Sequence, residues 1–176
     1  MKLLRWLCAA AVLASCSCNK QPDKVPVGQQ AVQEAPQLAS QIPMGEAKWE
    51  PQLLSGFYGV EGNSWRWTAR QFSVALRPPA GAAQNGAVLE FDFTVPDVVV
   101  QKLKSVTLSA SLGGADLGSE TYSKSGPAVY KKDIPATALG GDSVKVQFSL
   151  NKAMQPNGDE HRELGVVANS VKLTAK

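Results

Sequence analysis

The sequence has 176 residues, with 18 lysines and arginines against 15 aspartates and glutamates, three cysteines and one histidine. Its formal net charge of +3 includes no dense block of basic residues, which excludes the electrostatic pattern of a nucleic-acid-binding protein. A single histidine and so few cysteines also exclude the usual zinc ligand sets, and we expect no cofactor.

The first fifteen residues show the three zones of a secretory signal peptide. Lys2 and Arg5 supply positive charge, residues 7–13 are apolar, and two small residues follow. The apolar stretch is far shorter than the roughly 20 residues of a membrane-spanning helix, and no later stretch reaches that length. We expect residues 1–15 to be removed, which leaves 18 − 2 = 16 basic residues against 15 acidic ones.

The end of this signal, Leu13-Ala14-Ser15-Cys16, resembles the lipobox of bacterial lipoproteins. The resemblance implies diacylglycerol on the thiol of Cys16, cleavage before it and acylation of the new amine. Several acyl chains, at roughly 0.8 kcal/mol per buried methylene, give a stable membrane anchor. Ser17, in place of aspartate after the anchor, implies the outer rather than the inner membrane. The alternative is a signal peptide in which the cysteine is incidental.

The two other cysteines lie outside the expected domain. Cys8 belongs to the signal, and Cys18 follows the anchor by two residues. The folded part therefore contains no disulfide and depends on its core. We interpret Cys18 as an incidental residue, with a second acylation site or a free thiol as alternatives.

Residues 16–47 are rich in glutamine, proline, alanine and valine, and residues 17–47 contain no aromatic side chain. Such a composition buries too little apolar surface to offset the entropy of the chain. We expect a flexible tether with a reach of about 30 Å, followed by one domain over residues 48–176.

From Trp49 onward, apolar and polar residues alternate with the period of two that is typical of a strand with one buried face. The clearest strands are predicted at 72–76, 89–95, 106–112 and 144–150, and further candidates are 56–61, 65–69, 117–122, 128–134 and 164–174. Helical turns are expected only near 97–103 or 135–139. One-sided alternation predicts an all-β, two-sheet antiparallel β-sandwich, and the absence of paired cysteines favours a jelly roll over an immunoglobulin-like fold.

Few residues indicate catalysis or metal binding. His161 has no Gly-x-Ser-x-Gly elbow to accompany it, and we expect it to be a loop residue. A glycosidase-like enzyme is a remote alternative, because it needs only a pair of carboxylates among Glu61, Glu90, Asp92, Asp159 and Glu163. Asn157, Asp159 and Glu160 could seat calcium, but they lack the spacing of a dedicated calcium loop, and we expect no metal.

The aromatic segment Ser64-Trp65-Arg66-Trp67-Thr68 is the most informative motif. On a strand, Trp65 and Trp67 share one face, and Arg66 and Thr68 share the other. An exposed tryptophan pair is a platform on which sugars stack, whereas an inward pair is core. We expect Trp67 to belong to the core and leave Trp65 open.

Two motifs together resemble a bacterial β-sandwich module that is associated with envelope proteins and with polypeptides carrying glycosyltransferase domains. The first runs from Gly56-Phe57-Tyr58 through Glu61 to Trp65-Arg66-Trp67-Thr68, and the second is Asp159-Glu160-His161-Arg162-Glu163-Leu164-Gly165. The resemblance spans about residues 55–174 and implies work at surface glycans.

The same residues support two hypotheses. In the first, a structural clasp of opposite charges joins the two ends of the domain; arginine suits it because its planar fork pairs with carboxylates through two bonds. The second is a ligand site. The residues that carry the clasp hypothesis are Glu61, Arg66, Asp159, Arg162 and Glu163, and those of the ligand site are Trp65, Arg66, Asp159, Arg162 and Glu163.

The sequence thus predicts a lipid-anchored envelope lipoprotein with a non-catalytic binding domain. The expected partners are the membrane, through the anchor, and a surface polysaccharide. A protein-interaction or scaffolding module that binds an envelope protein is the alternative.

Overall fold

The computed structural model describes residues 37–176, so the predicted signal peptide, Cys16, Cys18 and most of the predicted tether lie outside the described residues. Within this range no helix is both long and apolar enough to cross a membrane. The helical segments are short: η1 (Ala47–Gln52), α1 (Ala82–Asn85), α2 (Asp97–Leu103) and η2 (Ala136–Ala138). The strands are β1 (Gln41–Pro43), β2 (Leu53–Glu61), β3 (Trp65–Leu76), β4 (Ala87–Val95), β5 (Val106–Leu112), β6 (Ala115–Tyr122), β7 (Gly126–Ile134), β8 (Val144–Leu150) and β9 (Val167–Ala175).

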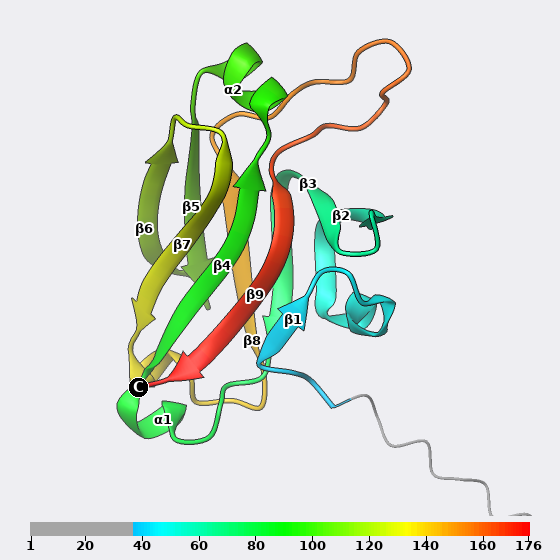
Figure 1. The fold of residues 1–176 in the computed structure, drawn as a ribbon. Coiled ribbons are helices and arrows are strands. Elements are labelled where there is room, and N and C mark those ends of the chain that lie inside the picture. Colours follow the sequence, from blue (N-terminus) through cyan, green and yellow to red (C-terminus); the bar gives the residue numbers. More distant parts are fainter. Residues whose placement is uncertain (1–36) are drawn as a thin grey trace, which may run out of the picture. The chain divides into compact units, whose positions relative to one another are not determined.

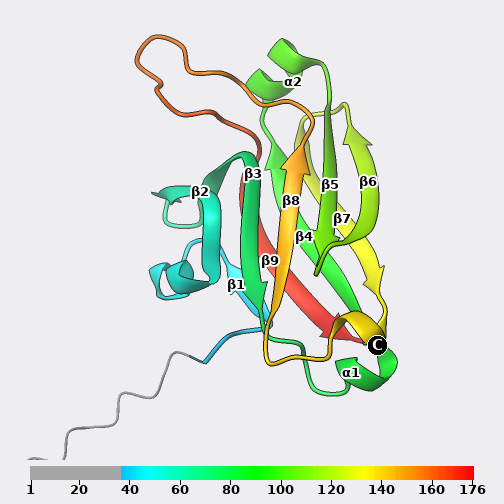
Figure 2. The same ribbon diagram turned by 180° about the vertical axis from the view of Figure 1, so that it is seen from behind.

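These strands form one continuous antiparallel sheet that is folded into two layers. The strand order is β6-β5-β8-β3-β9-β4-β7, with β1 added to β9 and β2 added to β3. Figure 1 shows β7, β4 and β9 as the near layer, and Figure 2 shows β3, β8, β5 and β6 in front when the molecule is seen from behind. The layers join where β3 pairs with β9, at Arg66 with Ala168 and Trp67 with Val167.

The core fills the space between the layers with the inward residues of the alternating strands. Phe72, Phe91 and Phe148 meet at its centre, with ring centroids 5.0 to 5.5 Å apart. Each ring comes from a different strand, so the contact joins β3 and β8 of one layer to β4 of the other. Aromatic contacts of this kind add to the stabilisation from buried area.

The predicted all-β sandwich is confirmed, and so is the antiparallel arrangement, because every strand pair is antiparallel. The alternation gives clean burial patterns in β4, β5 and β8. One difference concerns β3, which unites the two strands predicted at 65–69 and 72–76. Arg70 and Gln71 are exposed, but nothing in them breaks an extended backbone.

The predicted boundary between tether and domain at residue 48 is wrong. Residues 41–43 form β1 on the edge of β9, and Ile42 and Met44 are completely buried in the core. Gln52 reinforces this segment, because its side chain exchanges hydrogen bonds with the backbone of Ala39 at 2.8 and 3.1 Å. The domain therefore includes residues 37–47, which seal one side of the sandwich.

We predict that Ile42→Ala lowers the free energy of unfolding by about 2–4 kcal/mol, because it leaves a cavity beside β9. Equilibrium urea denaturation measures this loss. Gln41→Ala, on the exposed face of the same strand, is the matched control and should change stability little. A substitution of Ile42 that is as mild as that of Gln41 would show that β1 contributes nothing to the fold.

Candidate functional site

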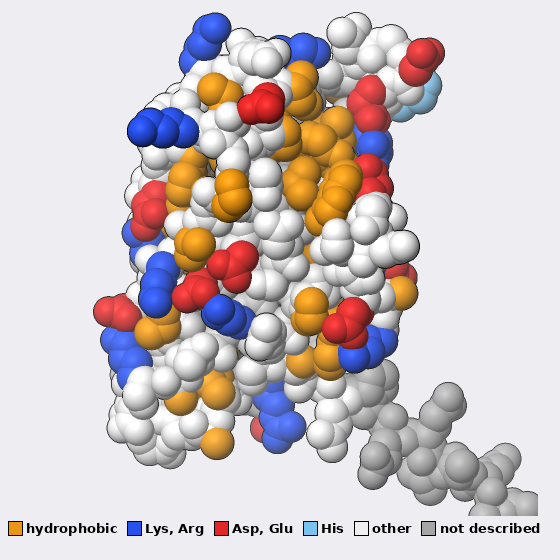
Figure 3. All heavy atoms as spheres, in the orientation of Figure 1, with side chains coloured by type: hydrophobic (Ala, Val, Ile, Leu, Met, Phe, Trp, Pro, Cys, Tyr) orange, Lys and Arg blue, Asp and Glu red, His pale blue; other side chains and the backbone are white. Residues whose placement is uncertain are grey.

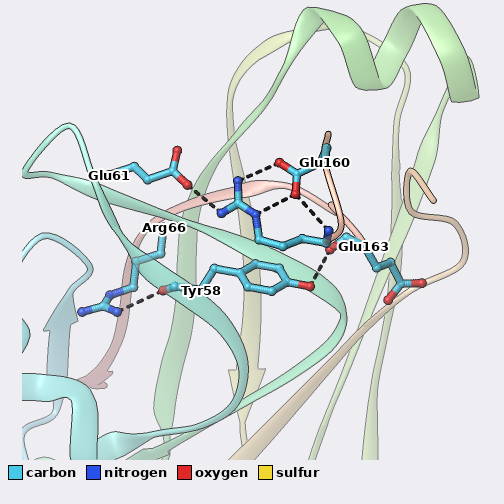
Figure 4. A network of polar contacts seen from close by, with 6 residues as sticks. Tyr58, Glu61, Arg66, Glu160 and Glu163 are labelled. Carbon is cyan, nitrogen blue, oxygen red and sulfur yellow. Dashed lines mark hydrogen bonds and ion pairs between the residues drawn. The ribbon is translucent and has the colours of Figure 1, made fainter. Parts of the chain in front are cut away.

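The two charged motifs meet at the guanidinium of Arg162. Its Nη1 donates to Oε1 of Glu61 at 2.7 Å, and its Nε and Nη2 donate to the two carboxylate oxygens of Glu160 at 2.9 and 2.8 Å. Figure 4 shows Glu61 and Glu160 approaching the same guanidinium from different sides. The ion pair with Glu61 thus joins the end of β2 to the long loop between β8 and β9.

Tyr58 packs against Arg162 and also binds the backbone of the next residue, Glu163. The Arg162 guanidinium lies 5.2 Å from the centroid of the Tyr58 ring, and the Tyr58 hydroxyl donates to the backbone oxygen of Glu163 at 2.9 Å. The hydrogen bond from Arg162 holds the pKa of Glu160 down to about 2, and Glu160 in turn raises the pKa of Arg162. Both groups therefore stay charged over the whole physiological range.

Glu163 is also engaged within the fold. Its Oε2 accepts a hydrogen bond from the backbone N–H of Arg70 at 3.0 Å, and its Oε1 accepts one from Gln155 at 3.2 Å. Two residues on, Gly165 lies so close to β3 that an added Cβ would be 2.8 Å from Oγ1 of Thr68 and 2.5 Å from Leu150. The Glu163-Leu164-Gly165 part of the motif is thus explained by packing of the loop onto β3.

Arg66 does not take part in the clasp, which corrects that hypothesis for this residue. It is only 3% exposed, and it donates to the backbone oxygens of Met44 and Tyr58 at 2.9 and 3.0 Å. Its carboxylate partner is Glu50, at 3.0 Å, rather than an acid of the second motif. Arg66 therefore ties η1, β2 and the residue that follows β1 to β3 from inside the fold.

Trp67 is half-buried and packs against the hydrophobic core, as expected, although the fully buried side chains of this segment are Arg66 and Thr68. Arg66 and Thr68 point inward, where the Thr68 hydroxyl donates to the backbone oxygen of Val166 at 3.2 Å and accepts from its N–H at 3.1 Å. Trp65 and Trp67 are half-buried on the outer face and meet edge to face, with centroids 6.4 Å apart. The reason is that neighbouring irregular segments present backbone polar groups to β3, and polar side chains must satisfy them.

The other predicted polar residues do not converge. Asp159 and His161 are exposed in the loop between β8 and β9, and Asp159 makes none of the ion pairs found within residues 37–176. Asn157 and Glu160 exchange backbone hydrogen bonds in a tight turn, and the Glu160 carboxylate is occupied by Arg162. Within the described residues, no three acidic, histidine or cysteine side chains are grouped as metal ligands.

The carboxylates considered for a glycosidase are also engaged elsewhere. Glu90 pairs with Lys131 and Lys172, and the hydrogen bond from Lys172 lowers its pKa. Asp92 accepts a hydrogen bond from the Ser170 hydroxyl at 2.7 Å. A general acid needs a raised pKa, which is the opposite of what Lys172 does to Glu90.

A different surface has the form of a binding site. On the outer face of the layer in front in Figure 2, the strand registers align outward side chains into two rows. One row crosses β3, β8 and β5 as Gln71, Ser149 and Ser109. The other crosses β2, β3, β8, β5 and β6 as Ser55, Ser73, Gln147, Ser111 and Asp116.

These rows line a hollow of about 390 Å³, which we call the serine groove. Its walls also include Gly114 at the β5–β6 turn and atoms of the core residues Phe72, Ala110 and Phe148. Gln71 and Gln147 are exposed, whereas Ser55 and Ser73 share a hydrogen bond of 2.8 Å at one edge. The groove has a volume within the range of about 300–1,000 Å³ that is usual for ligand sites.

By contrast, the predicted ligand residues share no such hollow. A hollow of about 260 Å³ beside the loop between β8 and β9 includes Arg162, but not Trp65, Arg66, Asp159 or Glu163. Figure 3 shows the face opposite the serine groove, where hydrophobic side chains gather in the upper part of the view and charged side chains are spread around them. The serine groove is therefore the better candidate site within residues 37–176.

Comparison with known proteins gives architectural neighbours only. No family model and no curated protein matches the sequence. Among solved structures, the CBM36-1 domain of a multidomain xylanase from the hindgut metagenome of Trinervitermes trinervoides is 16% identical, with a TM-score of 0.41 over 73% of this chain and 94% of that one. TmCBM27, a carbohydrate-binding module with specific mannan recognition, is 15% identical, with a TM-score of 0.45 over 79% and 97%.

A CBM4 structure is 11% identical, with a TM-score of 0.35 over 85% of this chain and 93% of that one. Because each of these TM-scores is below 0.5, we draw nothing from these neighbours about a ligand.

We predict that Arg66→Ala destabilises the domain more than Arg162→Ala does. The first change leaves two backbone oxygens without their donor in a buried place, at about 1–3 kcal/mol each. The second removes two half-exposed ion pairs, each of which contributes up to about 1 kcal/mol. Urea denaturation of both variants measures the two losses in free energy of unfolding. Equal losses would show that the contacts of Arg162 stabilise the domain as much as the buried contacts of Arg66 do.

Proposed function

We propose that this protein is a carbohydrate-binding lipoprotein of the bacterial cell envelope, whose ligand lies in the serine groove. The observation that carries the proposal is the alignment of hydroxyl and amide side chains across neighbouring strands. Serine and glutamine side chains both donate and accept hydrogen bonds, which is the property needed to match the hydroxyls of a sugar. The groove therefore suits a ligand that is polar and rich in hydroxyl groups.

The dimensions of the groove favour an oligosaccharide. The longer row crosses five strands, which at a spacing of roughly 4.8 Å span about 19 Å. On β3, β8 and β5 both rows lie in ladders without register shifts, so the positions of these side chains are set before a ligand binds. Preorganisation of this kind reduces the entropic cost of binding.

The protein-interaction alternative has less support from the described surface. Within residues 37–176, the large hydrophobic side chains that are strongly exposed are Leu54 and Val129, on β2 and β7 respectively. Scattered apolar residues of this kind are normal on a protein surface. The edge strand β2 is also interrupted by register shifts, which discourage pairing with another chain.

The membrane anchor is part of the same proposal and is supported by the lipobox resemblance of Leu13-Ala14-Ser15-Cys16. Ser17 favours the outer membrane. Because residues 37–47 belong to the domain, the segment between Cys16 and residue 37 is left as the link to the lipid. Many anchored copies side by side would gain avidity for a polymeric glycan.

We predict that Gln147→Ala and Ser111→Ala each weaken glycan binding by about three- to tenfold. Each change removes one hydrogen-bonding side chain from the centre of the longer row, and such a bond contributes roughly 0.5–1.5 kcal/mol. A glycan array with the full-length protein identifies a ligand, and isothermal titration calorimetry then gives the affinities. Gln101→Ala, an exposed glutamine on α2 outside the groove, is the matched control.

Two outcomes would contradict this assignment. Loss of binding in Trp65→Ala with full binding in Gln147→Ala would move the ligand to the tryptophan face. Absence of binding to every glycan on the array and to isolated cell-wall polysaccharide would contradict carbohydrate binding itself.

We predict that Cys16→Ala abolishes labelling by a radioactive fatty acid and leaves uncut precursor, because the thiol is the expected site of diacylglycerol attachment. Cys18→Ala is the matched control and should retain both labelling and cleavage. Unchanged labelling in the Cys16 variant would refute the anchor. Separation of the two membranes on a density gradient tests the outer-membrane assignment, which recovery in the inner membrane would contradict.

A further inference from the structure

The charge in the serine groove is concentrated at one end. Of the described residues that line it, Asp116 alone carries a formal charge, and every other polar lining side chain is a serine or glutamine. Asp116 is exposed, and it takes part in none of the ion pairs formed within residues 37–176. A ligand in the groove therefore meets a carboxylate that forms no ion pair with the described domain.

The position of this carboxylate is fixed by the surrounding fold. Its Oδ1 accepts a hydrogen bond from the backbone N–H of Gly118 at 2.9 Å, and the Gly118 backbone oxygen accepts one from the Tyr130 hydroxyl at 2.6 Å. Tyr130 is completely buried and belongs to β7, so the core holds the β6 segment that carries Asp116. Asp116 also lies opposite Ser111 in the longer row.

We propose that the groove selects sugars that carry a protonated amine, with the amine placed at Asp116. This inference rests on the proposed function of the groove and adds a charge preference to it. The hydroxyls of the sugar chain match the serines and glutamines, and the ammonium group matches the carboxylate. Acetylation of the amine removes the positive charge and with it the reason for the preference.

The test compares two probes that differ only in acetylation: glucosamine oligomers and N-acetylglucosamine oligomers of equal length. The measurement is made at about pH 6, below the pKa of about 7.7–8.0 of an α-amino group, so that the sugar amines are protonated. We expect the full-length protein to bind the glucosamine oligomer about two- to fivefold more tightly, which is the strength of an exposed ion pair. The preference should shrink as salt is added, because screening shortens the range of the attraction.

Asp116→Asn should abolish the preference, so that the two oligomers bind with equal affinity. Asparagine retains the side-chain oxygen that accepts from Gly118, so the turn is preserved, and an unchanged urea unfolding curve verifies this. Asp142→Asn, an exposed aspartate in the loop before β8, is the matched control and should keep the preference.

The outcomes separate the two proposals. Equal affinity for both oligomers, or a preference that survives in Asp116→Asn, would overturn the role of Asp116 while leaving the groove as a glycan site. Binding of neither oligomer would overturn the amine preference, and the glycan array then decides whether the groove binds other carbohydrates.

Discussion

Strand β3 is the element on which the rest of the structure depends, because it belongs to both layers. Through Arg66 and Trp67 it pairs with β9, and from Gln71 to Leu76 it pairs with β8. The sheet can fold over on itself only because one strand is long enough to have a different partner at each end. The core between the layers and the groove outside them both follow from this strand.

The two ends of β3 therefore face different physical demands. Its later part lies between β2 and β8, where the ladder satisfies the backbone and the inward residues Phe72, Val74 and Leu76 are apolar. Its first part adjoins β1, η1 and the residues before β9, whose backbone groups are not all paired in ladders. Arg66 and Thr68 supply the missing hydrogen bonds, so two polar residues occupy inward positions there.

Much of the fold could be predicted from the sequence, because the strongest signal is local. Alternation over residues 89–95, 106–112 and 144–150 corresponds closely to β4, β5 and β8. β1 could not be found in this way, since Ile42 and Met44 are two apolar residues in a segment rich in proline and glutamine. The local sequence also does not indicate which face of residues 65–68 is buried, because this depends on the segments that contact β3.

The pairing of Arg162 with Glu61 lay within reach of sequence reasoning, since opposite charges stood at both ends of one domain. The serine groove could not be predicted in this way. Ser109, Ser111, Gln147 and Ser149 were assigned to wetted faces by alternation, as any soluble strand would require. Their convergence into one groove depends on β8 lying between β3 and β5. These three strands are distant in sequence, so the local sequence does not indicate that order.

The structure also separates the residues that hold the domain together from those that are available to a ligand. Arg162, Glu61 and Glu160 satisfy one another, and a ligand that recruited any of them would first have to break short charge-assisted hydrogen bonds. Gln71 and Gln147 are exposed on a rigid sheet, and recruiting them costs the displacement of water. A groove of this kind gains its affinity from hydrogen bonds without aromatic stacking, so a single site binds modestly. Under the proposed function, firm attachment to a polymer would come from many copies held on one membrane, which is the arrangement that the proposed lipid anchor would provide.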